Sequence, residues 1–292
     1  MQTGMRADPI TVLALVVAVL AISTSGPLAA YAAAPAMAIA FWRNALAAGV
    51  LVPAAGRRAD ELRRLVGPAR REGLYSVLAG VALALHFATW IPAVKLTTVA
   101  AATALVATQP VWQGLIAVGQ GRRLPGLTWL GIVAAVVGAV IATGADIGVS
   151  ASAVQGDLLA VAGGVAGAVY VALGERTRAT ISTTSYTAVC YTTSAFVLVV
   201  VCLVAQVPLS GYPNTAWLAI AAIALGPQLL GHSMFTFALR RVAATTVAML
   251  ILLEVPGSAL IAWIWLDQVP PAGAWPGLAL ILVGVALVAR FR

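Results

Sequence analysis

The chain contains two histidines, His86 and His232, and both lie inside long apolar runs. They stand 146 residues apart, which is half the length of the chain, and each is followed nine residues later by a basic residue, Lys95 or Arg241. An imidazole among apolar side chains must hydrogen-bond to a neighbour, titrate or line a polar cavity. A lone histidine would favour packing against a nearby carbonyl. A matched pair favours a shared cavity, because related segments can bring both rings to one place.

Two charged residues also fall within apolar runs, where a charge is costly and is therefore a functional candidate by default. Arg43, next to Asn44, could bind a substrate carboxylate through its guanidinium, or it could hold its own helix against backbone carbonyls or against Glu254. Glu254 could carry a proton, or it could be the permanent ion-pair partner of Arg43. The sequence predicts a coupling role or a structural ion pair for Arg43 and Glu254, and it leaves both open.

Aromatic and amide side chains within the same runs complete the candidate substrate site. Aromatic rings can stack on an organic substrate or a cation. Amides next to a proline lie where the helix has free backbone carbonyls, and such broken turns supply ligand contacts in transporters. The predicted substrate-binding residues are His86, Trp90, Gln109, Trp112, Tyr170, Gln228, His232 and Trp263.

The elements that position these residues must be membrane helices. Of the 292 residues, 62% are hydrophobic and only 9% are charged, whereas soluble domains carry about 25% charged residues. A helical span needs about 20 mostly apolar residues. The first run resembles a secretory signal, but we count it as a span because it belongs to the repeat described next. The predicted spans are residues 10–31, 36–54, 74–94, 99–119, 127–144, 156–175, 184–206, 215–238, 243–266 and 273–290.

The chain matches itself at one offset, 146 residues, without gaps. Coincidence of several uncommon residues at a single offset indicates an internal repeat. The matched pairs include His86 with His232, Lys95 with Arg241, Pro110 with Pro256, Pro125 with Pro271, Trp129 with Trp275, Gly131 with Gly277 and Gly138 with Gly284. Each half, residues 1–146 and 147–292, then holds five spans. Because five is odd, the sequence predicts an all-α integral membrane protein of ten transmembrane helices in two inverted five-helix repeats.

The net charge of +8 fits this topology. The arginines form pairs between apolar runs and make no basic face of the kind that binds nucleic acid, so we expect no nucleic-acid partner. If the N-terminus is cytoplasmic, every Lys and Arg except Lys95 and Arg43 falls in a cytoplasmic segment, as the positive-inside rule requires. We therefore expect a multi-pass protein of the cell (plasma) membrane with both termini in the cytoplasm.

Several segments resemble the EamA-type family of the drug/metabolite transporter superfamily over essentially the whole chain. They are FWRNALAAGVLV in the second span, the proline-containing ATQPVWQGLIAV and LLEVPGSALIAWIWL, the glycine-spaced helices LTWLGIVAAVVGAVIATG and AWPGLALILVGVALVAR, and GDLLAVAGGVAGAVYVAL at the start of the second half. The chain departs from the family where members often carry a glutamate at the end of spans four and nine, since it reads GQGRR and LDQVP there.

The resemblance implies a secondary transporter that moves a small organic metabolite by alternating access, commonly an exporter of amino acids or related compounds. Its partners would be that small molecule, the lipid bilayer and, as a further candidate, protons. No phosphate-binding GxxxxGK[ST] and no HExxH occurs, so we expect neither an ATP-driven pump nor an enzyme, and no cofactor or metal. A channel and a membrane scaffold without transport activity remain alternatives, and an intramembrane enzyme is a weaker one.

Overall fold

The computed structural model describes residues 8–144, 150–270 and 272–290. Within these ranges the chain is helical and contains no strand. The helices are α1 (Pro9–Ser23), α2 (Ser25–Tyr31), α3 (Ala36–Gly56), α4 (Ala59–Val66), α5 (Arg70–Leu96), α6 (Val99–Val106), α7 (Gln109–Gly119), α8 (Gly126–Gly144), α9 (Ala151–Arg178), α10 (Thr183–Val204), α11 (Asn214–Ile223), the π-helix η1 (Ala224–His232), α12 (Ser233–Ala238), α13 (Ala244–Ile251), α14 (Glu254–Leu266) and α15 (Ala274–Arg290). Arg6, Pro271, Arg292 and the predicted boundary between the halves at position 146 lie outside the described residues.

Eight stretches of the described chain are long and apolar enough to cross a bilayer, several of them built from two or three consecutive helices. Two further apolar helices, Gly126–Ala142 and Ala274–Val288, are shorter by the same measure and fall below the ~20 residues of a full span. Large apolar side chains face outward, and Ile10, Phe196 and Ile264 are between 67% and 75% exposed. A surface of exposed apolar side chains is suited to contact with the lipid tails of a bilayer. The chain is thus an all-helical membrane protein, while the count of ten spans stays a prediction.

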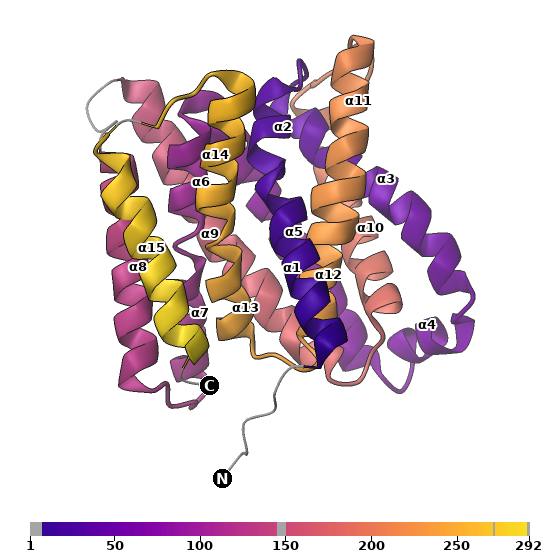
Figure 1. Ribbon diagram of the computed structural model, residues 1–292. Coiled ribbons are helices and arrows are strands. Elements are labelled where there is room, and N and C mark those ends of the chain that lie inside the picture. Colours follow the sequence, from indigo (N-terminus) through magenta and orange to yellow (C-terminus); the bar gives the residue numbers. More distant parts are fainter. Residues whose placement is uncertain (1–7, 145–149, 271, 291–292) are drawn as a thin grey trace.

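The predicted fourth and ninth spans are both interrupted near the middle of the bundle (Figure 1). Helix α7 begins at Gln109, one residue before Pro110, and α14 begins at Glu254, two residues before Pro256. Proline has no N–H to donate and disfavours helical geometry in the residue before it, so a helix tends to end there. As a result, the first residues of two short helices lie inside the bundle.

A second irregularity lies in the segment between α11 and α12. Residues Ala224–His232 form the π-helix η1, which contains Pro227 and ends at His232. A π-helix takes more residues per turn than an α-helix and is frequent at functional sites. The irregular backbone therefore coincides with one of the two histidines.

Helices α8 and α15 lie side by side at one edge of the bundle (Figure 1). A Cβ on Gly131 would lie 2.8 Å from the carbonyl oxygen of Gly284, and one on Gly284 would lie 2.5 Å from that of Gly131. Gly138 and Gly277 meet in the same way, at 2.6 and 2.4 Å. Glycine lets the two backbones touch. Because the 146-residue offset exchanges the partners, the antiparallel contact is reciprocal, like one across a two-fold axis.

The two halves share one interior. Helix α5 of the first half packs along α9 of the second, and α3 packs along α10. Helix α5 also packs against α10, and Gly80 on α5 allows this approach, since a Cβ there would lie 2.5 Å from the carbonyl oxygen of Cys190. The fully buried side chains Phe87, Tyr186 and Tyr191 fill the space between these helices. Polar groups of α5, α9, η1 and α14 therefore lie between the halves.

Candidate functional site

A cavity lies inside the bundle. Five of the residues predicted for the site line it: His86 of α5 and Gln109 at the start of α7 from the first half, and Tyr170 of α9, His232 at the end of η1 and Glu254 at the start of α14 from the second. Apolar side chains form much of the remaining wall. The starts of α7 and α14 and the end of the π-helix η1 thus all line the same cavity.

The two histidine rings are neighbours, with their centres 6.1 Å apart. Nδ1 of His86 lies 2.8 Å from the carbonyl oxygen of Gly163. A carbonyl can only accept, so Nδ1 carries the hydrogen and the neutral ring keeps Nε2 as an acceptor. The ring of His232 makes no hydrogen bond within the described residues, and it packs against the rings of Phe87 and Tyr170 at 5.4 and 6.0 Å. His86 therefore both bonds to a carbonyl and lines the cavity.

Glycines on α9 make room for this arrangement. A Cβ on Gly163 would lie 3.2 Å from Cβ of Trp90. A Cβ on Gly167 would lie 2.9 Å from Oε1 of Gln109 and 3.1 Å from Nδ1 of His86. Gly163 and Gly167 thus allow α9 to pack closely against its neighbours. Gly167 in addition leaves space for two polar groups of the cavity wall.

Arg43 is fully buried in α3 and is not part of the cavity wall. Its Nε donates to Oε1 of Gln228 at 2.8 Å, its Nη1 donates to Oγ of Ser25 at 3.2 Å, and its guanidinium lies 3.9 Å from the centre of the Phe87 ring. Gln228 in turn donates to Oδ1 of Asn44 at 3.3 Å. Only Nη2 lacks a partner in the part of the chain described. These contacts support a structural role for Arg43.

Glu254 is 5% exposed and lines the cavity. Its carboxylate has no hydrogen bond or direct ion pair among the described residues. Arg43 interacts with it electrostatically, but the two side chains do not meet. As the first residue of α14, the carboxylate also lies at the positive end of a helix dipole. A direct Arg43–Glu254 ion pair is therefore not what holds either side chain in place.

Two predicted site residues lie one layer behind the cavity. Trp90 stacks on His86, with ring centres 6.2 Å apart and planes 5° from parallel. Gln228 is fully buried and is the hydrogen-bond partner of Arg43. Neither lines the cavity. Both instead support residues that face it or neighbour it.

Trp112 and Trp263 lie elsewhere. Trp112 donates to Oγ1 of Thr108 at 3.4 Å and is only partly buried. Trp263 is 39% exposed and packs on Trp275, with ring centres 5.8 Å apart. The prediction that both face a shared volume with the histidines does not agree with this geometry. A helix has an outward face, and membership of a span does not show which face a ring occupies.

Sequence reasoning missed part of the wall that follows His232. Phe235, Thr236 and Leu239 line the cavity at positions three, four and seven after His232, which is the spacing of one helix face. Thr236 Oγ1 also lies 3.0 Å from the hydroxyl of Tyr170. A helical projection from His232 would have found these residues. Within the described residues no group of three His, Cys, Asp or Glu side chains could hold a metal ion.

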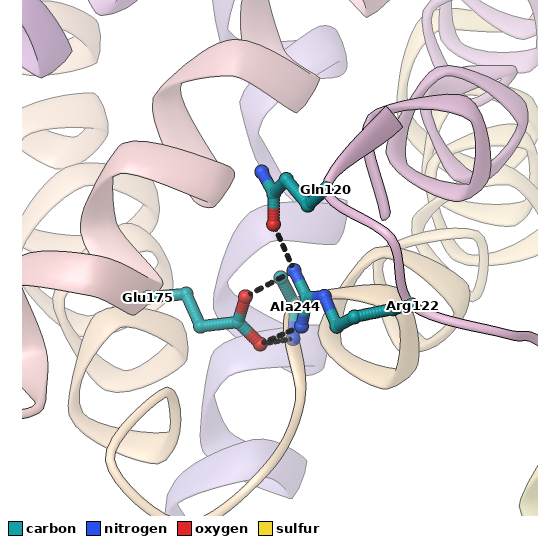
Figure 2. Close-up of polar contacts among 4 residues, drawn as sticks. All are labelled: Gln120, Arg122, Glu175 and Ala244. Carbon is teal, nitrogen blue, oxygen red and sulfur yellow. Dashed lines mark hydrogen bonds and ion pairs between the residues drawn. The ribbon is translucent and has the colours of Figure 1, made fainter. Parts of the chain in front are cut away.

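A polar cluster joins three segments at the end of the bundle where α1 begins and α15 ends, which we call the termini face (Figure 1). Arg122, after α7, donates from Nη2 to Glu175 Oε2 at 2.8 Å and from Nη1 to Oε1 at 3.2 Å (Figure 2). Oε1 of Glu175 accepts the N–H of Ala244, the first residue of α13, at 2.8 Å. Nη2 of Arg122 also donates to Oε1 of Gln120 at 2.7 Å. The cluster links α7, α9 and α13, all three of which also contribute to the cavity wall.

The matched cations Lys95 and Arg241 bind opposite ends of the first span. Nζ of Lys95 donates to the carbonyl oxygens of Ala30 and Ala32, at 3.1 and 2.7 Å, where α2 ends. Nε of Arg241 lies 3.1 Å from Oδ2 of Asp8, the residue that caps α1. The repeat thus places one cation at each end of the α1–α2 segment.

Outside the spans, Glu61 of α4 joins the two halves. Its carboxylate accepts the N–H of Ser182 at 2.7 Å and the hydroxyls of Ser182 and Ser185 at 2.5 and 2.6 Å. Partial burial alone would raise the pKa of Glu61, but these hydrogen bonds outweigh it and hold the pKa below its usual value. Ser182 is the N-cap of α10, so the carboxylate lies at the positive end of that helix.

Comparison with known proteins agrees with the architecture. A solved structure titled only "Crystal structure of protein" is similar in fold, with a TM-score of 0.76 and 22% sequence identity over 97% of this chain and 99% of that one. No curated protein matches the chain in sequence. The model of the EamA-like transporter family matches twice, at residues 9–144 and 154–290, and so covers most of the chain in two repeats. The chain therefore belongs to the EamA-like transporter family.

Proposed function

We propose that this protein is a secondary transporter that exports amino acids or related small metabolites by alternating access. The observation that carries the proposal is the buried cavity whose wall is drawn from both halves, including the matched residues His86 and His232. Secondary transporters hold their substrates at such a repeat boundary, next to broken helices. The proposed substrate-binding residues are His86, Gln109, Tyr170, His232 and Glu254, with Trp90 and Gln228 as supporting residues.

The proposal includes an inverted arrangement of the two halves, 1–146 and 147–292, in the plasma membrane with both termini cytoplasmic. The reciprocal contact of α8 with α15 supports the inversion, because a two-fold axis in the membrane plane would produce it. The arginines of the loops at the termini face support a cytoplasmic position for that face. We thus propose that each half contains five transmembrane helices and that the two halves have opposite orientations in the membrane.

Alternating access needs contacts at each face that form and break in turn. The Arg122–Glu175 pair lies at the termini face, and the Lys95 contacts lie at the opposite face. Each joins segments that are far apart in sequence. We include these contacts in the proposal as the closures of the two faces.

The decisive experiment is transport by the purified protein in proteoliposomes. If the protein is a carrier, proteoliposomes preloaded with unlabelled substrate should accumulate a radiolabelled amino acid by counterflow. If it is a channel, preloading should not stimulate uptake of the label. A scaffold would move nothing, and an enzyme would return a chemically altered compound. Absence of counterflow for every amino acid and related metabolite tried would contradict the proposal.

Protons are the candidate coupling ion, because Glu254 and the two histidines are titratable groups of the cavity wall. An imposed pH gradient should then drive accumulation of the labelled substrate. Accumulation that is indifferent to the gradient would leave exchange or facilitated movement as the mode of transport.

A further inference from the structure

The polar groups of the cavity wall differ in whether they are free to hydrogen-bond to a ligand. Glu254 presents carboxylate oxygens that no described residue binds, and Nε2 of His86 is left as an acceptor by the bond from Nδ1 to Gly163. The hydroxyl of Tyr170 is already paired with Thr236. Nε2 of Gln109 is a buried donor without a partner in the described chain. The wall thus holds the carboxyl group of Glu254 and a neutral acceptor on His86 beside the amide donor of Gln109, and the His232 ring lines it as well.

No cationic side chain lines the cavity among the described residues. The nearby positive charge is that of Arg43, which is bonded to Gln228 and Ser25 and covered by the Phe87 ring. An anionic group entering the cavity would therefore meet Glu254 without a cation to receive it. Burial of that group without a cationic partner would be strongly unfavourable.

An organic ammonium group matches the same wall. It carries three donors and a positive charge, and charge-assisted bonds to a carboxylate are among the strongest hydrogen bonds in proteins. The aromatic rings of Tyr170 and Phe235 border the cavity, and ring faces attract cations. The largely apolar remainder of the wall suits the hydrocarbon part of such a molecule.

We propose that the site recognises its substrate through a protonated amino group bound by Glu254, and that a free carboxyl group on the substrate is dispensable. This proposal rests on the proposed transport function, and it specifies that the site binds the amino group of an amino acid. Arg43 acts from behind as a fixed counter-charge, and the carboxyl end of the substrate lies away from Glu254.

The test uses three compounds of one shape, L-phenylalanine, L-phenylalaninamide and N-acetyl-L-phenylalanine, with 2-phenylethylamine as an amine without a carboxyl group. The leucine series serves as a second set. Binding to the purified protein is measured by calorimetry and by thermal stabilisation, and transport by counterflow in proteoliposomes. Compounds with a free amino group are expected to bind, and the N-acetyl compounds to bind at least tenfold more weakly.

Variants of Glu254 test whether this residue binds the amino group. Glu254→Gln is expected to weaken amine binding about tenfold or more while Glu254→Asp retains the preference for amines, because only the second keeps the charge. If Glu254→Gln does not fold, the double variant Arg43→Gln/Glu254→Gln removes both charges and should show the same loss. Glu72→Gln is the matched control, since Glu72 lies at the start of α5, outside the cavity.

The proposal is overturned if the N-acetyl compounds bind as tightly as the amides, or if no compound with a free amino group binds. Equal amine binding by the Glu254→Gln variant and the parent would also overturn it. Failure of the transport function looks different. In that case amines bind in a Glu254-dependent way, but no labelled compound shows counterflow.

Discussion

The Arg122–Glu175 cluster at the termini face gives a quantitative prediction. Arg122 is 38% and Glu175 is 18% exposed in their side chains, and ion pairs near the surface contribute about 0.2–1 kcal/mol. The bond from Ala244 N–H to Glu175 Oε1 satisfies a donor at the start of α13, whose N-cap Ala243 supplies no side-chain acceptor. Such a cap contributes about 1 kcal/mol. Together the contacts stabilise this closed face by roughly 1.2–2 kcal/mol.

Glu175→Ala removes both contributions, so the population open at the termini face should rise about 8- to 30-fold. Arg122→Gln removes only the ion pair and should raise the open population by about fivefold at most. The population is read from the rate at which Thr236→Cys, in the cavity wall, reacts with a membrane-impermeant maleimide added at the termini face. The native Cys190 and Cys202 are fully buried and should add little background.

Arg63→Gln is the control, because Arg63 pairs with Asp60 in full contact with solvent, with side chains 79% and 96% exposed. It should leave the labelling rate unchanged. The reasoning is refuted if Glu175→Ala labels no faster than Arg63→Gln. It is also refuted if the rate rises equally when the maleimide is added at the opposite face, since general loosening would do that.

Three further predictions follow from other parts of the molecule. Glu61→Gln should lower the melting temperature at neutral pH. Because the pKa of Glu61 in the folded protein is held below its usual value, the stabilisation is present above that usual value, and the difference between parent and variant should vanish as the pH falls through the folded-state pKa. Gly167→Ala should reduce substrate affinity without loss of folded yield, since its Cβ would meet Gln109 and His86, whereas Gly49→Ala, with nothing within 4 Å, should bind normally; equal affinities would remove Gly167 from the site. Cysteines at Asp60 and Arg123 should be labelled only from the cytoplasm and one at Ser210 only from outside, and labelling of Arg123→Cys and Ser210→Cys from the same side would contradict the inverted repeat.

The interior of this fold was predictable where the sequence repeats itself. The match of His86 with His232 indicated a shared cavity, and Pro110 and Pro256 indicated the broken helices that place Gln109 and Glu254 beside it. These signals work because a matched residue and a proline constrain the backbone directly. They also explain why His86, His232, Gln109 and Glu254 come together.

Other contacts were not predictable in the same way. The rotational phase of each span decides whether a ring faces protein or lipid, and a uniformly apolar helix gives little periodic signal for it. Trp263 was therefore assigned inward, although it lies on an outer surface. The bonds of Glu61 to Ser182 and of Arg122 to Glu175 join residues 121 and 53 positions apart. Nothing in the local sequence of either partner marks such a pair.

The reciprocal glycine contact between α8 and α15 has a consequence for the history of the chain. A five-helix polypeptide with one copy of this face would be complementary to a second copy inserted in the opposite orientation. Such a polypeptide would have to tolerate both orientations, so its loop charges could not favour one. Joining two copies in a single chain lifts that restriction, because each copy then needs only one orientation. The positions matched by the repeat differ in this way, with Arg122 and Arg123 in one half and Gln268 and Val269 in the other.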